Sequence, residues 1–306
     1  MQTMIFDENG RPTGFKTVKN NSNEILKRSD DLDFLKEDND KFEDPFAKDY
    51  WNLYAGEEPL SPLKFTNGKT QEDVVKEIVD LSKTHKVIFL HGTCGTGKSA
   101  IALNVARVLG KASIVVPVKA LQKQYEEDYI TKKHVKKLDG SKMKIAMITG
   151  KDNHDSIIKL GVSCADPMLP ENIRITDRNF ERLQEYIQQN PFVERNRLPL
   201  AQIRRATVAA ANPYWSPIIP EDYELKSLTD ANKMKYLGVN GQTYIFYHRR
   251  RGCSYYDQYL SYIKSDVIIF NSAKYLAEMS IGRKPLTDVD IIDEGDEFLD
   301  SFFKQA

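Results

Sequence analysis

The segment HGTCGTGKS, at residues 91–99, constrains the fold of this 306-residue chain more than any other stretch. It fits the pattern G-x-x-x-x-G-K-[ST] at Gly92, Gly97, Lys98 and Ser99. An apolar run, KVIFL, precedes it, and residues with helical spacing follow it. Glycines let such a loop turn its backbone N–H groups toward phosphate oxygens, and the start of the helix adds positive potential. A glycine-rich turn without a ligand is the structural alternative, but the strand-to-helix context favours a phosphate-binding loop.

Residue types within this loop predict individual roles. Lys98 is expected to reach the β- and γ-phosphates of ATP, and Ser99 is expected to ligate Mg²⁺. Cys94 is either a redox-sensitive thiol or simply a small residue at an unconstrained loop position, and the second interpretation is the simpler one. The predicted nucleotide-binding residues of the loop are Gly92, Thr93, Cys94, Gly95, Thr96, Gly97, Lys98 and Ser99.

Apolar runs alternate with helical segments on both sides of a long polar region. KVIFLHG, SIVVPV and KIAMITG are predicted strands, and DVIIFN and VDIID follow after Cys253. Strands alternating with helices predict an α/β fold with a parallel sheet. The intervening region contains prolines, basic clusters (Arg204-Arg205 and Arg249-Arg250-Arg251) and one predicted helix, Phe180–Gln189. The predicted organisation is an acidic extension at 1–62, a first α/β part at 63–150, an insert at 151–252 and a second α/β part at 253–306.

Charge is balanced overall, with 44 basic and 44 acidic residues, but it is unevenly distributed. Residues 30–58 hold 11 acidic and 3 basic side chains, whereas residues 111–151 hold 10 lysines and 4 acids. The second region is compatible with a polyanionic partner, and two solvated surfaces are the alternative. No stretch approaches the roughly 18 apolar residues of a membrane helix. The N-terminus lacks a signal-peptide pattern and the three cysteines form no disulfide framework, so a cytoplasmic, nucleoid or nuclear location is expected.

A second acidic motif, VDIIDEG, follows about two hundred residues after the loop. A P-loop enzyme needs a carboxylate at the tip of a neighbouring strand for Mg²⁺ and a group that orients water. Asp293 is predicted to hold the metal through its water shell, and Glu294 is predicted to act as general base. The structural alternative is a polar turn at the end of a buried strand.

Four segments in this order resemble the XPD/DinG-like iron–sulfur helicases of superfamily 2: GTCGTGKS, VPVKALQKQYEEDY, the Cys253-led SYYDQYLSYIKSDVIIFNSAKYL, and IIDEGDEFLD. The resemblance covers Phe65–Phe303 and implies a P-loop RecA-like parallel sheet with helices on both faces, interrupted by a small iron–sulfur-type insert. Asp296 stands where the family usually has a histidine that couples hydrolysis to DNA. Gln71, 27 residues before Lys98, corresponds to the adenine-reading glutamine; a surface glutamine at a helix start is the alternative.

The same resemblance implies contacts with the backbone of single-stranded or forked DNA. They follow the second and third strands, where lysines and backbone amides suit recognition of phosphates in any sequence. Tyr214 and Trp215 either stack on bases or pack within the insert. The implied DNA-contacting residues are Pro117, Lys119, Gln124, Gly150, Lys151 and Asn153.

Family members carry a 4Fe–4S cluster in the insert, held by four cysteines. Cys164 and Cys253 match two ligands, but Ser156 and Asn212 stand where further cysteines would be natural. A zinc site that adds His154 and His248 to the two cysteines is conceivable by ligand type, although its spacing matches no familiar pattern. The expectation is an insert that has lost its metal.

Together these motifs predict the first motor domain of an ATP-dependent DNA helicase that uses ATP and Mg²⁺. Such enzymes hydrolyse ATP between two RecA-like domains, so a second domain or polypeptide is expected as a partner, and little unwinding is expected from the 306 residues alone. One alternative is a P-loop small-molecule or nucleotide kinase with Arg249–Arg251 in its lid. Another is a non-catalytic nucleotide- and DNA-binding regulatory module.

Overall fold

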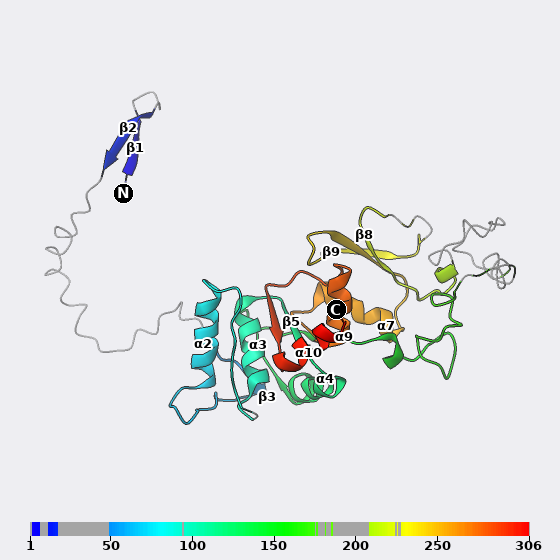
Figure 1. Ribbon diagram of the computed structural model, residues 1–306, viewed down its shortest axis with the longest axis horizontal. Coiled ribbons are helices and arrows are strands. Elements are labelled where there is room, and N and C mark those ends of the chain that lie inside the picture. Colours follow the sequence, from blue (N-terminus) through cyan, green and yellow to red (C-terminus); the bar gives the residue numbers. More distant parts are fainter. Residues whose placement is uncertain are drawn as a thin grey trace. The chain divides into compact units, whose positions relative to one another are not determined.

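The computed structural model describes the backbone of residues 2–6 and 12–17, and residues 49–93, 95–174, 176, 181, 185, 208–223, 225 and 228–305. It divides into two compact units, Met1–Lys48 and Asp49–Ala306. In the first unit, β1 (Gln2–Phe6) pairs antiparallel with β2 (Pro12–Thr17). All motifs described above lie in the second unit, shown with the first in Figure 1.

A four-stranded parallel sheet forms the centre of the second unit. Its order is β12 (Val289–Ile292), β5 (Ala112–Val116), β11 (Val267–Asn271) and β7 (Ile145–Ile148). Every residue of β5 and β11 is buried, as expected for parallel strands covered on both faces. The structure thus confirms the predicted α/β fold with a parallel sheet.

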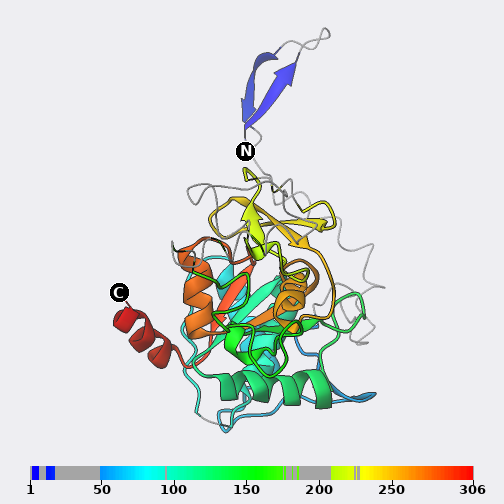
Figure 2. The same ribbon diagram turned by 90° about the vertical axis from the view of Figure 1, so that its right-hand side faces the viewer.

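Alternating residues of the inner strands enter two separate apolar clusters. In β11, Val267 and Ile269 pack into one cluster with α3, whereas Ile268 and Phe270 pack into a second one rich in tyrosine. Since neighbouring side chains of a strand point to opposite faces, the two clusters lie on the two faces of the sheet. Figures 1 and 2 show the helices gathered around this sheet.

The helices of the first α/β part begin at clear sequence signals. α2 (Gln71–Ser82) has a capping box in which Thr70 and Asp73 bond each other's backbone. α3 (Lys98–Leu109) starts at the phosphate loop and buries Ala100 to Arg107. α4 (Lys119–Glu126) follows β5 and runs into the π-helical η3 (Glu127–Lys132). A small sheet of β4 (Glu58–Pro59), β3 (Tyr54–Ala55) and β6 (Lys133–His134) packs beside them.

In the second α/β part, helices precede β11, connect β11 to β12 and follow β12. After Cys253 come α7 (Ser254–Asp257), η6 (Gln258–Leu260) and α8 (Ser261–Lys264). α9 (Ser272–Ser280) connects β11 toward β12, with Asn271 as its N-cap. α10 (Gly295–Gln305) follows the acidic motif. None of the helices in the described part of the chain has the length and apolar character needed to span a membrane.

One predicted strand does not form. The apolar run KVIFLHG before the phosphate loop has no strand assignment, and Phe89 is 91% exposed. A buried strand needs a hydrogen-bonded neighbour, and none of the strands in the described ranges pairs with residues 86–92. The prediction of a strand here was wrong, because an apolar run becomes a buried strand only where a neighbouring strand pairs with it.

The insert holds an antiparallel sheet that the sequence reading missed. Its order is β8 (Ile218–Pro220), β10 (Thr243–His248) and β9 (Asn232–Leu237), preceded along the chain by the 3-10 turn η4 (Lys151–Asn153). The predicted helix Phe180–Gln189 lies outside the described residues except for Glu181 and Glu185, and Arg204 and Arg205 lie outside them too.

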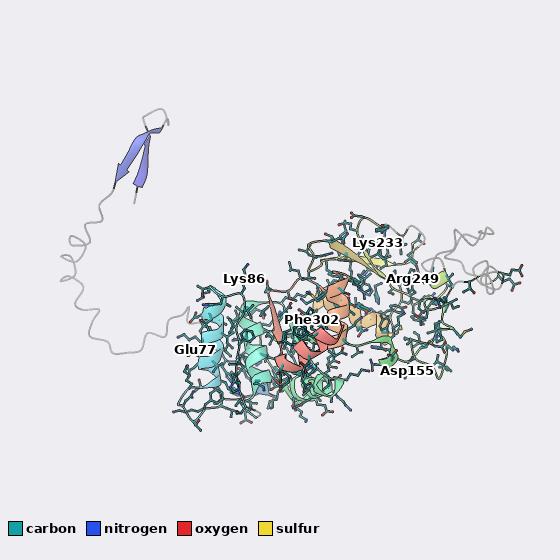
Figure 3. The ribbon with its side chains drawn as sticks, in the orientation of Figure 1. Glu77, Lys86, Asp155, Lys233, Arg249 and Phe302 are labelled. Atoms are coloured by element: carbon teal, nitrogen blue, oxygen red, sulfur yellow. The ribbon has the colours of Figure 1, made fainter. Side chains whose placement is uncertain are left out.

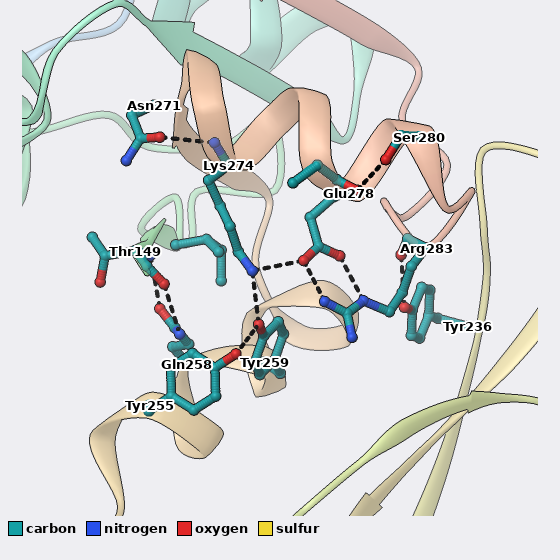
Figure 4. A network of polar contacts seen from close by, with 12 residues as sticks. Thr149, Tyr236, Tyr255, Gln258, Tyr259, Asn271, Lys274, Glu278, Ser280 and Arg283 are labelled. Atoms are coloured by element: carbon teal, nitrogen blue, oxygen red, sulfur yellow. Dashed lines mark hydrogen bonds and ion pairs between the residues drawn. The ribbon is translucent and has the colours of Figure 1, made fainter. Parts of the chain in front are cut away.

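A buried ion-pair network joins α9 to the segment that leads to β12. The carboxylate of Glu278, 1% exposed, lies 2.7 Å from Lys274 Nζ and accepts two hydrogen bonds from the Arg283 guanidinium. Lys274 also donates to the Tyr259 hydroxyl at 2.9 Å (Figure 4). Burial raises the pKa of Glu278, but hydrogen bonds and charge from Arg283 and Lys274 outweigh it and hold that pKa below 4.5.

Glu278→Gln is expected to lower the free energy of unfolding by about 3 kcal/mol, because it leaves two partly buried cations without their counter-charge. The folded-state pKa is depressed, so this stabilisation is present above pH 4.5 and is lost as the pH falls through the lower folded-state value. Urea unfolding of wild type and Glu278→Gln between pH 7 and pH 3 measures this difference in stability. The control is Glu77→Gln, whose exposed pair with Lys69 should contribute less than about 1 kcal/mol (Figure 3). An equal loss of unfolding free energy in both variants, unchanged between pH 7 and pH 3, would contradict a stabilising role for the Glu278 ion pairs.

Candidate nucleotide and metal site

The phosphate loop has the backbone that its sequence predicts. Gly95 and Gly97 have φ of +83° and +72°, in the left-handed region that favours glycine. Gly97 is the N-cap of α3, so Lys98 and Ser99 occupy the first turn of that helix. The N–H groups of such a first turn have no partner within the helix and can bind phosphate oxygens. Cys94 lies outside the described residues.

Gln71 braces this loop from the start of α2. Its side chain is 2% exposed; Nε2 donates to the Thr96 carbonyl at 2.9 Å, and Oε1 accepts from the Leu63 N–H at 2.9 Å. A Cβ at Gly97 would lie 2.3 Å from Nε2, so only glycine leaves room for the contact. The amide is buried rather than at the surface. Its predicted contact with adenine stays a prediction.

The loop and the distant acidic motif meet at one ion pair. Lys98 Nζ lies 3.4 Å from Glu294 Oε1, although 196 residues separate them. It also lies 3.3 Å from the Gly92 carbonyl. Both side chains keep some exposure, 27% for Lys98 and 39% for Glu294. A ligand can therefore reach the ammonium and carboxylate groups.

The sheet places the two carboxylates beside the loop. β12 pairs with β5, and the Asp293 N–H continues that ladder by donating to the Val115 carbonyl at 2.8 Å. Burial and the adjacent Glu294 charge raise the pKa of Asp293, while Lys98 opposes the rise. Glu294 has φ +50°, the one left-handed non-glycine residue of the described chain. Backbone strain of this kind concentrates at functional sites.

The donor set fits Mg²⁺ rather than a softer metal. Ser99 offers a hydroxyl and Asp293 a carboxylate, which are hard oxygen ligands. Mg²⁺ commonly uses one or two carboxylates with phosphate and water oxygens, so it needs no cage of protein ligands. The described residues accordingly include no cluster of three or more His, Cys, Asp or Glu side chains arranged for a metal.

The two insert cysteines lie side by side. Cys164 Sγ and Cys253 Sγ are 3.8 Å apart and both are buried free thiols. The two histidines of the zinc alternative have other partners: His154 contacts the Thr149 hydroxyl at 2.7 Å, and His248 contacts Asp257 at 2.8 Å. Asn212, at a position where a cysteine would be natural, donates to the buried Glu171 at 2.8 Å. The three side chains His154, His248 and Asn212 thus form hydrogen bonds within the chain.

The residues expected to contact DNA follow the carboxyl ends of β5 and β7, the two strands that flank β11. Lys119 starts α4 after β5 and donates to Asn153 Oδ1 at 2.8 Å, so segments 34 residues apart meet there. Gln124 is exposed and Pro117 is half-buried. Lys151 contacts Asn172 Oδ1 at 2.6 Å.

The aromatic pair Tyr214–Trp215 and the basic residue Arg249 pack within the insert. Tyr214 and Trp215 pack against the tyrosine-rich cluster, as in the packing alternative. Arg249 is buried and bonds Asp230 at 3.1 Å together with the Ala210 and Asn212 carbonyls. This guanidinium is held within the insert, so of the three arginines proposed for a kinase lid only Arg250 and Arg251 are exposed.

Sequence reasoning missed Tyr125, a buried side chain of α4. Its hydroxyl donates to Asp293 Oδ2 at 3.3 Å. The chain has 15 tyrosines, and no spacing singles this one out.

Comparison with known proteins gives one match. Residues 64–189 match a family described as Type III restriction enzyme, res subunit, and this stretch includes the phosphate loop and α4. Neither a curated protein nor a solved structure matches the chain. The match and the parallel sheet agree on a RecA-like fold with a P-loop. Residues 64–189 are therefore similar to the res subunit of Type III restriction enzymes, a helicase-type motor domain, and lie on a RecA-like α/β fold.

Proposed function

We propose that this chain is the first motor domain of an ATP-dependent DNA helicase of the XPD/DinG-like type. The observation that carries the proposal is the 3.4 Å contact between Lys98 and Glu294, because it unites the phosphate loop and the acidic motif in one site. The resemblance of the segments around Cys253 and Asp293 supports the narrower family assignment.

Each side chain of the site has a role in hydrolysis. Lys98 would bind the β- and γ-phosphates, and Ser99 with Asp293 would hold Mg²⁺, which neutralises phosphate charge when bound. Glu294 would orient a water molecule toward the γ-phosphorus and accept its proton as the bond to ADP breaks. Lys98 contacts Glu294, so a bound γ-phosphate would replace the carboxylate as the partner of Lys98.

Exposed apolar surface supports the need for a second RecA-like domain or polypeptide. Phe89, just before the phosphate loop, is 91% exposed, and Phe303 on α10, after the acidic motif, is 72% exposed. Phe302 on the same helix is also exposed (Figure 3). A second domain docked there would cover these side chains. The partner would supply the arginines that stabilise the transferring phosphoryl group, so slow turnover is expected without it.

The Lys119–Asn153 contact supports a binding path for single-stranded DNA across the ends of β5 and β7. Lysine and amide groups there would contact phosphates and not bases, which suits movement along any sequence. Asp296, exposed on the first turn of α10, occupies the place of the family's coupling histidine. DNA is therefore expected to stimulate hydrolysis less than in relatives with that histidine.

Lys119→Ala is expected to weaken single-stranded DNA binding at every sequence tested, because it removes one phosphate contact. The slope of log K against log salt should fall by about 0.7. Fluorescence anisotropy with labelled oligo-dT and a mixed-sequence oligonucleotide at several salt concentrations measures both effects. The control is Lys83→Ala, a lysine paired with Asp80 at the end of α2, which should leave the slope unchanged. An unchanged slope in Lys119→Ala would remove this residue from the path.

ATP hydrolysis measured with and without single-stranded DNA tests the function as a whole. The helicase proposal expects hydrolysis that DNA stimulates and a further rise when the second motor domain is supplied. Phosphate transfer to a small molecule, unaffected by DNA, would support the kinase alternative instead. Robust processive unwinding by this chain alone would refute the need for a partner.

A further inference from the structure

Tyr125 connects the two segments of the metal site from within the core. It lies on α4, and its side chain is 3% exposed. Its hydroxyl donates to Asp293 Oδ2 at 3.3 Å and also interacts with the Ser99 hydroxyl. Ser99 comes from the phosphate loop and Asp293 from the end of β12. One phenol therefore bonds Asp293 directly and lies within interaction range of Ser99, the two side chains expected to hold Mg²⁺.

Hydrogen bonds fix both oxygens of the Asp293 carboxylate. Oδ2 accepts from Tyr125, and Oδ1 accepts from the Glu294 N–H at 3.1 Å. A carboxylate oxygen has lone pairs left for a metal or its water ligands after accepting one hydrogen bond. These two donors thus set the orientation of the carboxylate without blocking it.

The hydroxyl can serve both neighbours at once. A phenol has one proton to donate and lone pairs to accept. Ser99 can donate to Tyr125 while Tyr125 donates to Asp293. The ring is held in the core beside Tyr129, at 5.8 Å between centroids.

We infer that Tyr125 is a positioning residue for the Mg²⁺ site, which orients the Asp293 carboxylate from α4 and links it to Ser99. The inference rests on the proposed function, because it assumes that these two residues bind Mg²⁺ with ATP. Hydrogen-bonding partners of metal ligands typically change metal affinity by about 10–100-fold when they are removed. α4 is anchored by Gln122, whose buried amide donates to the Ile148 and Ile269 carbonyls of the sheet at 3.2 Å.

Tyr125→Phe, which removes only the hydroxyl, tests the inference in the full chain. Binding of a fluorescent ATP analogue is measured in EDTA and across a Mg²⁺ titration. The expected result is a roughly 10-fold rise in the Mg²⁺ concentration needed for half-maximal tight binding. Nucleotide affinity in EDTA should match wild type. Tyr129→Phe, in the neighbouring ring, is the control and should match wild type in both conditions.

A second readout follows the metal itself. Electron paramagnetic resonance of Mn²⁺ with ADP reports bound and free ion, and Tyr125→Phe should bind Mn²⁺ about 10-fold more weakly. Equal losses of nucleotide affinity with and without metal would assign Tyr125 to packing and overturn the inference, as would wild-type Mg²⁺ and Mn²⁺ dependence. Failure of the proposed function looks different, because wild type itself would then show no nucleotide binding that depends on Lys98.

Discussion

Glu294→Gln is expected to slow ATP hydrolysis by about 100-fold to 10,000-fold, the range that a general base contributes. Glutamine keeps the shape of the side chain but cannot accept a proton from the attacking water. ATP binding should be retained and become slightly tighter, because Lys98 no longer has a competing carboxylate at 3.4 Å. Phosphate release under single-turnover conditions, with protein in excess over ATP, measures the chemical step even when turnover is slow.

Glu297→Gln is the matched control, because Glu297 is exposed on the first turn of the same helix, α10. Its hydrolysis rate should equal that of wild type. If Glu294→Gln also hydrolyses ATP at the wild-type rate, the chain is better described as a regulatory module that keeps nucleotide as a structural ligand.

Lys98→Ala is expected to weaken ATP binding by about 100-fold to 1,000-fold, equivalent to about 3–4 kcal/mol. The ammonium lies beside the Gly92 carbonyl and Glu294, where the β- and γ-phosphates would sit, and alanine removes that charge. AMP has neither a β- nor a γ-phosphate, so Lys98→Ala should weaken AMP binding much less than ATP binding. A comparison of ATP, ADP and AMP binding therefore locates the contact along the nucleotide.

Lys86→Ala removes an exposed lysine only a few residues before the loop (Figure 3). It should bind all three nucleotides as wild type does, which separates a specific phosphate contact from a general loss of positive charge. If Lys98→Ala binds ATP normally, nucleotide binds elsewhere or not through a phosphate loop.

The parts of the fold that local patterns specify could be predicted from sequence. The glycines of 92–97 predicted the turn before α3, and the apolar runs SIVVPV and DVIIFN became the inner strands β5 and β11. Both runs are continuous and lack alternation, which is typical of strands covered on both faces. The placement of Asp293 at the tip of a neighbouring strand also agrees with its motif.

The remaining features depend on tertiary contacts that composition does not encode. The run KVIFL matches β11 in apolar character but has no strand neighbour among the described residues, so it stays exposed. Tyr125 resembles many other tyrosines in sequence and becomes notable only because α4 directs it toward Asp293. The sequence left Gln71 as either an adenine contact or a surface residue at a helix start, and only the fold shows that it packs against Gly97.

The sequence did contain a pattern that indicates the hairpin β9–β10, which the sequence analysis did not predict. Asn240-Gly241 lies between NKMKYL and TYIFYH, and Asn-Gly between runs rich in apolar and aromatic residues is typical of a hairpin turn. The long polar segment before this pattern shows no strand pattern of its own. The hairpin β9–β10 could therefore have been predicted, whereas its pairing with the three-residue β8 could not.

Calorimetric titration of ATP in Mg²⁺ into wild type, Lys98→Ala and Glu294→Gln tests the central claim most directly. That claim is that Gly92–Ser99 and Asp293–Glu294 form one nucleotide site. The account predicts one ATP bound per wild-type chain, binding at least as tight in Glu294→Gln, and a loss of about 100-fold or more in Lys98→Ala. Absence of ATP binding by folded wild-type protein, or equal binding by all three, would contradict it.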